Sequence, residues 1–424
     1  MNTKLKKSLR VIGIIIAVLV VLIGVAYLTL APKPLKPPQE VSSLAELEAY
    51  LDDLTGFNAD SPPGLSLVVV KGGEIVYQEG FGLADGPQNI PATADTVYNQ
   101  WSMVKPMTAV AVLQLHEQGL LDIDDPVANY LPFFDVQYPS ESSETVTIRH
   151  LLNHSSGLRD AGPAMIDWIH FDGDPEWNQT ELIMEKLPDY TELTYEPGSQ
   201  AVYTNVGYMV LAAVIEAASG KTYEQYMIDH IFAPLGMDQT NWTYTEAMIA
   251  NEAAGANPSV DIQALMLPFI MDKDKRDALI REKQDGALWF NHVYTDQKGP
   301  TGPIGPATDT ARFLMAYLNR GELDGQRILS AESIAMMTNE GHILPAVKDP
   351  QNFGYTDYDL YSRGLGWAYV EDGDDFFITH SGGGPGFATD MRLYPDRDLG
   401  MVILANGSYL AREEIFDIVA SLDW

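Results

Sequence analysis

Trp101-Ser102-Met103-Val104-Lys105 places a serine one helical turn before a lysine, at the head of an apolar run from Met107 to Leu115. Residues three apart on a helix share a face, so a helix that begins near Ser102 would present its hydroxyl and the Lys105 amine to the same space. The positive end of the helix dipole favours an anionic nucleophile there. A serine cap followed by a lysine that extends to solvent gives the same pattern. The stretch therefore predicts a catalytic serine only if other motifs support it.

Length and composition set the broad class of the protein. The chain has 424 residues, 46% hydrophobic and 20% charged, which is typical of a globular protein with two or three core units. Cysteine is absent, which excludes disulfides, cysteine nucleophiles and thiolate zinc sites. Residues 1–40 hold six of the 26 basic and one of the 59 acidic residues, so the remainder has 20 bases, 58 acids and a net charge of −38. Such a body repels nucleic acid and anionic membrane surfaces, and no nucleic-acid partner is expected.

The N-terminal region predicts a membrane anchor over residues 1–31. Four basic residues precede Val11 to Leu30, twenty residues without a charge, which is enough for ~30 Å of helix and one bilayer crossing. The basic flank would stay in the cytoplasm and the body outside it. A cleaved signal peptide, which would leave the body secreted, is the alternative, although its apolar segment usually has ~7 to 15 residues. The proline-rich residues 32–42 predict a stiff spacer.

Residues 43–424 are predicted to form the functional domain. A short amphipathic helix is expected over 43–54, a hairpin around Gly72-Gly73, and strands between 366 and 405 before a closing helix over 410–422. Helix signals dominate from 102 to about 250. Residues 250–300 follow no motif and are expected to be an insertion near the site entrance with moderate helix content. Neither strand set can bury a face alone, so we expect one antiparallel sheet built from about 60–100 and 360–410.

Two further stretches complete the chemistry that a serine nucleophile needs. Tyr203-Thr204-Asn205 opens an apolar helix, and His380-Ser381-Gly382-Gly383-Gly384 follows a strand, where glycine lets a substrate lie against the backbone. A lysine beside a tyrosine can activate the serine, because the ammonium lowers the phenol's pKa and either the tyrosinate or a neutral lysine takes the proton. The N–H groups of Ser102 and Gly383 are the candidate oxyanion donors.

In this order and at these wide spacings, the Ser102–Lys105, Tyr203–Asn205 and His380–Gly382 stretches resemble the three signature motifs of the serine β-lactamase and penicillin-binding-protein superfamily. The tyrosine of the second motif is similar to the class C branch, which includes D-aminopeptidases, DD-carboxypeptidases and carboxylesterases. The resemblance covers about residues 64–408. Four supporting stretches also match, namely Leu121–Val127, His150–Leu158, Pro234–Met237 and Gly384–Phe387.

The resemblance implies an α+β, β-lactamase/transpeptidase-like fold, in which an antiparallel sheet flanked by helices and a largely helical domain enclose the site between them. It also implies an acyl-enzyme mechanism without metal or cofactor, on a small-molecule or peptide acyl substrate. Ser102 would attack the acyl carbonyl while Tyr203 and Lys105 move protons. The implied site consists of the catalytic residues Ser102, Lys105 and Tyr203 and the substrate-binding residues Asn205, His380, Gly382 and Gly383.

His380 bears on the choice of substrate, because lactamases of this branch carry lysine at that position. An unperturbed histidine, with a pKa of about 6.5, is mostly neutral at pH 7.5. We therefore expect uncharged esters or amides to be better substrates than β-lactams, and β-lactam turnover to improve as the pH falls from 8 toward 6. A β-lactamase or DD-peptidase stays open, because the sequence does not name the substrate. An anchored sensor that is acylated without turnover also stays open, since no separate deacylating base can be identified. His150 and His154 have metal-ligand spacing, but the resemblance gives that stretch a structural role.

Overall fold

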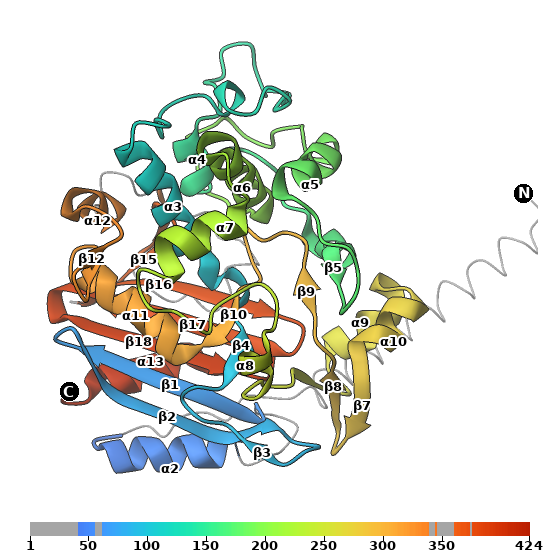
Figure 1. The fold of residues 1–424 in the computed structure, drawn as a ribbon, viewed down its shortest axis with the longest axis vertical. Helices are drawn as coiled ribbons and strands as arrows, with labels where there is room; N and C mark the ends of the chain where they lie inside the picture. Colours follow the sequence, from blue (N-terminus) through green and yellow to red (C-terminus); the bar gives the residue numbers. More distant parts are fainter. Residues whose placement is uncertain (1–40, 56–61, 339–343, 346–359, 374) are drawn as a thin grey trace, which may run out of the picture.

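The computed structural model describes residues 41–55, 62–338, 344–345, 360–373 and 375–424. Its centre is a nine-stranded antiparallel sheet in the order β13-β14-β15-β16-β17-β18-β1-β2-β3 (Figure 1). The strands are β1 (Gly64–Lys71), β2 (Glu74–Asp85), β3 (Ile90–Pro91), β13 (Leu344–Pro345), β14 (Leu360–Arg363), β15 (Ala368–Asp372), β16 (Asp375–Gly384), β17 (Phe387–Tyr394) and β18 (Leu399–Ala405).

The two ends of the described chain meet at the centre of this sheet. Strand β1 pairs antiparallel with β18, from Leu65 opposite Ala405 to Lys71 opposite Leu399. The strands at the two ends of the domain therefore form one sheet, as the sequence predicted, and the α+β class is confirmed.

Both faces of the central strands are covered, which explains why β1 is buried along nearly its whole length and is mostly apolar. Leu65, Leu67 and Val69 belong to a core cluster with helices α2 (Leu44–Thr55) and α13 (Arg412–Ser421). Val68 and Val70 point the other way, into the main core. Alternate residues of a strand face opposite sides, so a strand buried on both sides lacks the apolar–polar alternation of a half-exposed strand.

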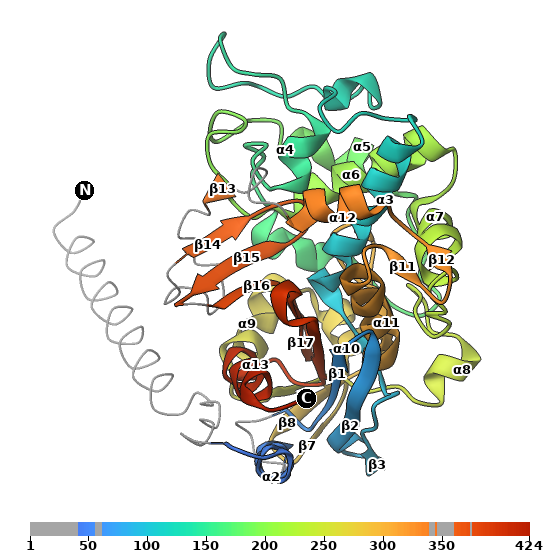
Figure 2. The same cartoon turned by 90° about the vertical axis from the view of Figure 1, so that its left-hand side faces the viewer.

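The helical part lies on the main-core side of the sheet (Figures 1 and 2). Its principal helices are α3 (Lys105–Glu117) and α6 (Asn205–Ser219), which pack together and are buried along most of their length. Contrary to the prediction, the α-helix does not begin at Ser102, which lies in a 3₁₀ turn, η1 (Trp101–Val104), that leads directly into α3. The other helices of this part are α4 (Ile148–Leu152), α5 (Gln179–Lys186) and α7 (Tyr223–Met227), with α11 (Ala307–Leu318) and α12 (Ala331–Thr338) beside the sheet.

Residues 250–300 contain more strand than we predicted. Two helices, α9 (Ile262–Ile270) and α10 (Lys273–Leu279), accompany a three-stranded sheet in the order β6-β8-β7. Strands β7 (Ile280–Gln284) and β8 (Ala287–Phe290) are joined by Asp285 and Gly286, both with positive φ, the conformation that favours Asp-Gly in a two-residue hairpin turn. The remaining elements are α8 (Glu246–Ile249), β4 (Val97–Asn99), β5 (Ile169–His170), β6 (Ala256–Pro258), β9 (Tyr294–Thr295), β10 (Ile304–Pro306), β11 (Glu322–Leu323) and β12 (Gln326–Arg327).

The predicted anchor, Val11 to Leu30, and nearly all of the spacer lie outside the described residues. Within the part of the chain that the structure describes, no helix combines the length and apolar character needed to cross a membrane.

Candidate active site

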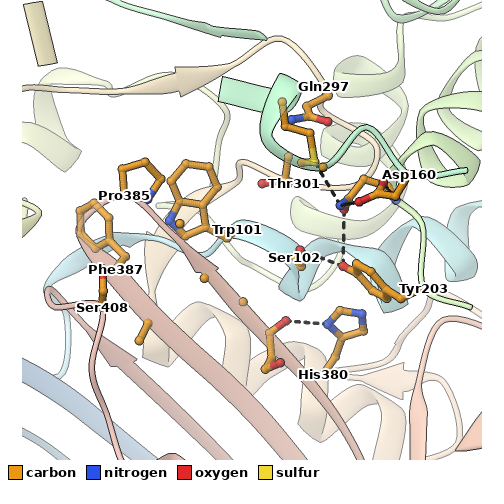
Figure 3. A pocket seen from close by; sticks show the side chains of 18 of the residues that line it. Trp101, Ser102, Asp160, Tyr203, Gln297, Thr301, His380, Pro385, Phe387 and Ser408 are labelled. Carbon is orange, nitrogen blue, oxygen red and sulfur yellow. Dashed lines mark hydrogen bonds between the residues drawn. The ribbon is translucent and has the colours of Figure 1, made fainter. Parts of the chain in front are cut away.

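A cavity of about 450 Å³ lies where the sheet meets the helical part, and the predicted site residues are found in and beside it (Figure 3). Its walls come from η1, the start of α6, strands β16 and β17, and the segment 250–300. Six of the seven predicted site residues line it, namely Ser102, Tyr203, Asn205, His380, Gly382 and Gly383. Lys105, the seventh, is completely buried next to this cavity, against Asn205 and the Tyr203 ring.

Ser102 lies in a turn whose first residue has an unusual backbone conformation. Trp101 has φ of 49°, which few non-glycine residues adopt, and its N–H donates to the Asn99 side chain. The carbonyl before it, that of Gln100, accepts a hydrogen bond from Thr389 of β17 at 3.0 Å. Strand β17 and the Asn99 side chain thus fix the backbone immediately before Ser102. The Tyr203 hydroxyl donates to the Ser102 Oγ at 3.0 Å (Figure 3).

Lys105 has the environment of a neutral amine. Its Nζ donates to Asn205 Oδ1 at 2.9 Å and to the Pro300 carbonyl at 2.7 Å, which accounts for both hydrogens of an uncharged amine. Burial lowers the pKa of Lys105 well below its ordinary value; Asp160 opposes this shift and Arg363 adds to it. The environment therefore favours a lysine with a free lone pair.

Tyr203 has a pKa shifted in the direction opposite to the one expected. Burial raises the pKa of the phenol above its ordinary value, and the hydrogen bond to Ser102 and the nearby Arg363 only partly offset this effect. The Lys105 Nζ lies 4.7 Å from the centre of the tyrosine ring, over its face. Burial therefore favours a protonated tyrosine with a neutral lysine over a tyrosinate with an ammonium.

Asn205 connects the lysine to a carboxylate that the sequence analysis missed. Its backbone N–H donates to Asp160 Oδ1 at 2.7 Å, and its side-chain amide approaches Asp160 Oδ2 at 3.4 Å. This arrangement turns the amide oxygen toward Lys105. Asn205 lines the cavity but is buried, so it positions the lysine as well as facing a substrate. Asp160 comes just after the matched stretch that ends at Leu158, and that proximity was the available signal.

The glycines of β16 have different roles. A Cβ on Gly382 would lie 2.3 Å from the Gln100 carbonyl oxygen and 3.1 Å from the Ser102 nitrogen, so only glycine allows the strand to approach the serine turn. A Cβ on Gly383 would meet nothing within 4 Å. Gly382 therefore sets the spacing between strand and serine, whereas Gly383 borders open space in the cavity.

His380 is an uncharged group in the wall of the cavity. Its Nδ1 lies 2.9 Å from the Ser381 carbonyl oxygen, to which it donates, and this leaves Nε2 as an acceptor. Burial lowers the pKa of His380 well below its ordinary value, and the positive charge of the nearby Arg363 adds to this effect. The imidazole is therefore neutral at pH 7.5.

Two arginines of the cavity were also missed. Arg363 lies over the Tyr203 ring, with its guanidinium 4.9 Å from the ring centre. Arg412, at the start of α13, donates to the Gly382 and Thr389 carbonyls at 3.0 and 2.9 Å. Both arginines lie at the end of a strand or helix, in stretches of sequence that contain no motif. Only the folded sheet brings them to the site.

The two histidines with metal-ligand spacing have structural contacts. His150 Nδ1 accepts from the Thr147 N–H in a helix cap, and His154 Nδ1 accepts from the Thr204 N–H. Across the described ranges, no group of three or more His, Cys, Asp or Glu residues has an arrangement that could hold a metal ion.

Comparisons with known proteins agree with this architecture. The family model described as Beta-lactamase matches residues 49–423. Penicillin-binding protein 4* of Bacillus subtilis (strain 168) is 29% identical over 349 residues, which cover 80% of this chain and 67% of that protein. The D-alanyl-D-alanine-carboxypeptidase/endopeptidase AmpH of Escherichia coli (strain K12) is 26% identical over 401 residues and 92% of each chain. The octameric penicillin-binding protein homologue from Pyrococcus abyssi aligns with a TM-score of 0.68 at 25% identity, over 89% of this chain and 77% of that one.

Proposed function

Because the chain belongs to the β-lactamase family and is a serine hydrolase, we propose that it forms an acyl-enzyme on Ser102. The observation that carries this proposal is the contact between the Tyr203 hydroxyl and the Ser102 Oγ at 3.0 Å, beside a buried Lys105. A serine hydroxyl becomes nucleophilic when a neighbouring base removes its proton. The site offers both a base and a proton donor next to one serine.

The proton steps follow from the charge states of the two partners. Neutral Lys105 takes up the proton that Ser102 loses as its Oγ bonds to the acyl carbonyl carbon. Tyr203, which is protonated at rest and contacts the Oγ, returns a proton to the leaving group as the acyl bond breaks. The N–H groups of Ser102 and Gly383 stabilise the oxyanion between these two steps. The Lys105 ammonium then returns its proton to the Tyr203 phenolate, which resets both groups. When a water attacks the acyl-enzyme, its proton passes to Lys105, Tyr203 protonates the Ser102 Oγ as the acyl bond breaks, and the lysine again reprotonates the tyrosine.

The substrate that we propose is an ester or an amide, including peptides. Apolar side chains such as Trp101, Met165 and Ile270 line much of the cavity, and the neutral His380 replaces a permanent cation. The second candidate is a substrate with a free carboxylate, as in a DD-peptidase or a β-lactamase. Arg412 in the cavity wall favours it, and the relative AmpH is named a D-alanyl-D-alanine carboxypeptidase.

We further propose that the enzyme is held at the membrane with its catalytic domain outside the cytoplasm. The support is the charge-free segment Val11 to Leu30 behind a basic flank. A secreted form cleaved after that segment is the alternative.

Labelling with a fluorophosphonate probe and turnover of a p-nitrophenyl ester test the assignment of Ser102. We expect stoichiometric labelling on Ser102, with both labelling and turnover lost in Ser102→Ala. The matched control is Ser381→Ala, which changes another serine of the cavity wall and leaves labelling intact. Labelling that persists in Ser102→Ala would refute the nucleophile. Labelling of the native protein without repeated turnover of any ester would support an acylated sensor instead.

A further inference from the structure

An apolar face on α9 is exposed beside the catalytic cavity, to whose wall the same helix contributes Ile270. Leu265, Met266 and Phe269 are 50%, 40% and 80% exposed, and Val260 just before the helix is 50% exposed. The three helix residues fall within one side, since residues four apart on a helix are neighbours. No other large apolar side chain of the described residues is as exposed as Phe269.

The opposite side of the same helix belongs to the body and to the site. Leu267 and Met271 are buried in the main core, and Ile270 lines the cavity that contains Ser102. Figure 1 shows α9 and α10 on the right-hand side of the molecule, above strands β7 and β8. The helix thus separates the catalytic cavity from an apolar surface that has no partner among the described residues.

We propose that this face of α9 lies in the interfacial region of the lipid bilayer, so that the cavity opens at the membrane. The inference rests on the proposed anchor and on the proposed hydrolase activity. An apolar helix face with leucine and phenylalanine is the kind of surface that inserts shallowly among lipid headgroups.

The chain outside the structure argues for lipid as the occupant. Residues 31–41 connect the segment that ends at Leu30 to the described domain, and eleven residues of extended, proline-rich chain reach about 34 Å at about 3.1 Å each. A tether of that length keeps a domain close to the bilayer surface at all times.

The local charge also permits this contact. Outside residues 1–40 the chain carries a net charge of −38, but residues 259–284 hold five basic and five acidic residues. This segment therefore lacks the net negative charge by which the rest of the body is repelled from anionic lipid headgroups. The chemistry fits a phosphatidylcholine-like surface, and it defines the substrate class as acyl esters or amides that partition into lipid.

The absence of cysteine allows a direct test on the full chain. A single Phe269→Cys is labelled with an environment-sensitive fluorophore and reconstituted in phosphatidylcholine vesicles. The control is Met184→Cys, which replaces an isolated apolar side chain that is 53% exposed on α5. We expect the label at 269 to shift to shorter wavelength and to be quenched at least twofold more by brominated lipid than the label at 184. Equal quenching of the two labels by aqueous iodide, with the protein still bound to vesicles, would overturn the inference and leave the anchor intact.

Turnover gives the second readout. Phe269→Asp should lower hydrolysis of a long-chain p-nitrophenyl ester in vesicles at least fivefold and leave a water-soluble acetate ester unchanged, whereas Met184→Asp should change neither. Equal loss on both esters would indicate structural damage and contradict the proposal. Disulfide cross-linking between two copies of the Phe269→Cys variant at low protein-to-lipid ratio would identify a second copy as the occupant and overturn it as well. Loss of all turnover in Ser102→Ala reports separately on the proposed hydrolase.

Discussion

In the proposed mechanism, the charge of one buried amine, that of Lys105, decides whether Ser102 can react. Lys105 is fully buried, and its two acceptors suit an uncharged amine better than an ammonium with three hydrogens. Burial penalises the charged form, and this effect outweighs the favourable field of Asp160. The lysine can therefore act as a base at a pH where an exposed lysine would be protonated.

This argument predicts the pH dependence of ester hydrolysis. A protonated lysine cannot accept the serine proton, so kcat/KM should fall as the pH falls through the lowered pKa of Lys105. Asp160 raises that pKa, so Asp160→Asn should lower it and move the acid limb of the kcat/KM profile to lower pH. Arg363 lowers the same pKa, so Arg363→Gln should move the limb to higher pH.

The control for these two variants is Asp189→Asn, which removes an exposed carboxylate away from the cavity and should leave the limb in place. Shifts of the same sign in both cavity variants would show that the limb does not report on Lys105.

Burial of His380 changes what we expect of β-lactams. An ordinary histidine would gain charge between pH 8 and pH 6, but burial, together with the nearby Arg363, holds the pKa of His380 well below 6.5. The ratio of kcat/KM for a cephalosporin to that for a p-nitrophenyl ester should therefore stay flat from pH 8 to about 6.5 and rise only at more acid pH. The earlier expectation of a gain across this whole range is wrong for a buried imidazole.

His380→Lys should raise that ratio by about fivefold at pH 7.5, because a charge-assisted hydrogen bond exceeds a neutral one by about 1 kcal/mol. His380→Gln, which stays neutral, is the control. A ratio that Lys and Gln change equally would mean that charge at this position does not select the substrate.

Four of the site residues could be found from the sequence because they lie at or just before the start of a helix. Ser102 and Lys105 precede an apolar helix, Tyr203 and Asn205 begin another, and each pattern is local. The fold brings Arg363 and Arg412 to the site, and no local pattern marks them. Asp160 is marked only by its position just after the matched stretch that ends at Leu158.

At the scale of the elements, the fit between β16 and the serine turn is the critical contact. Gly382 allows the strand to lie against Gln100 and Ser102, and the Thr389 hydroxyl of β17 completes the contact. The sequence identified the glycine run but placed it after the strand, whereas it forms the end of β16, and the sequence could not show which glycine meets the turn. The Asp285-Gly286 turn shows the opposite case, because its dipeptide signal was present and the hairpin was still missed.

The two neighbouring glycines make a matched pair of variants. Gly382→Ala would place a Cβ 2.3 Å from backbone oxygen, so we expect a loss of about 1–3 kcal/mol in the free energy of unfolding and a slower reaction with fluorophosphonate. Gly383→Ala finds open space, and its φ is not positive, so its unfolding midpoint should stay near that of the native protein. Denaturant unfolding checks both. Equal destabilisation by the two alanines would contradict the close approach at Gly382.

At the scale of the whole molecule, the pairing of β1 with β18 joins the two ends of the described domain in one sheet. These strands are separated by more than 300 residues, yet they lie side by side at the centre of one sheet. Sequence predicted this closure because neither strand group can bury a face alone. It did not predict the sheet within 250–300, where each strand has at most five residues and the pattern is short.

The charge-free segment Val11 to Leu30 leads to a prediction about the full chain. Twenty apolar residues can span the bilayer, whereas a body with a net charge of −38 has no electrostatic means of staying on an anionic membrane. We expect the full chain to sediment with membranes and to remain there in 1 M salt, where charges are screened within ~3 Å. Residues 41–424 should be soluble and should keep ester hydrolysis, since the β-lactamase family match covers 49–423. A full chain that salt releases would refute the anchor, because an apolar span does not depend on charge. A form in the medium that begins after residue 30 would instead identify the segment as a cleaved signal peptide.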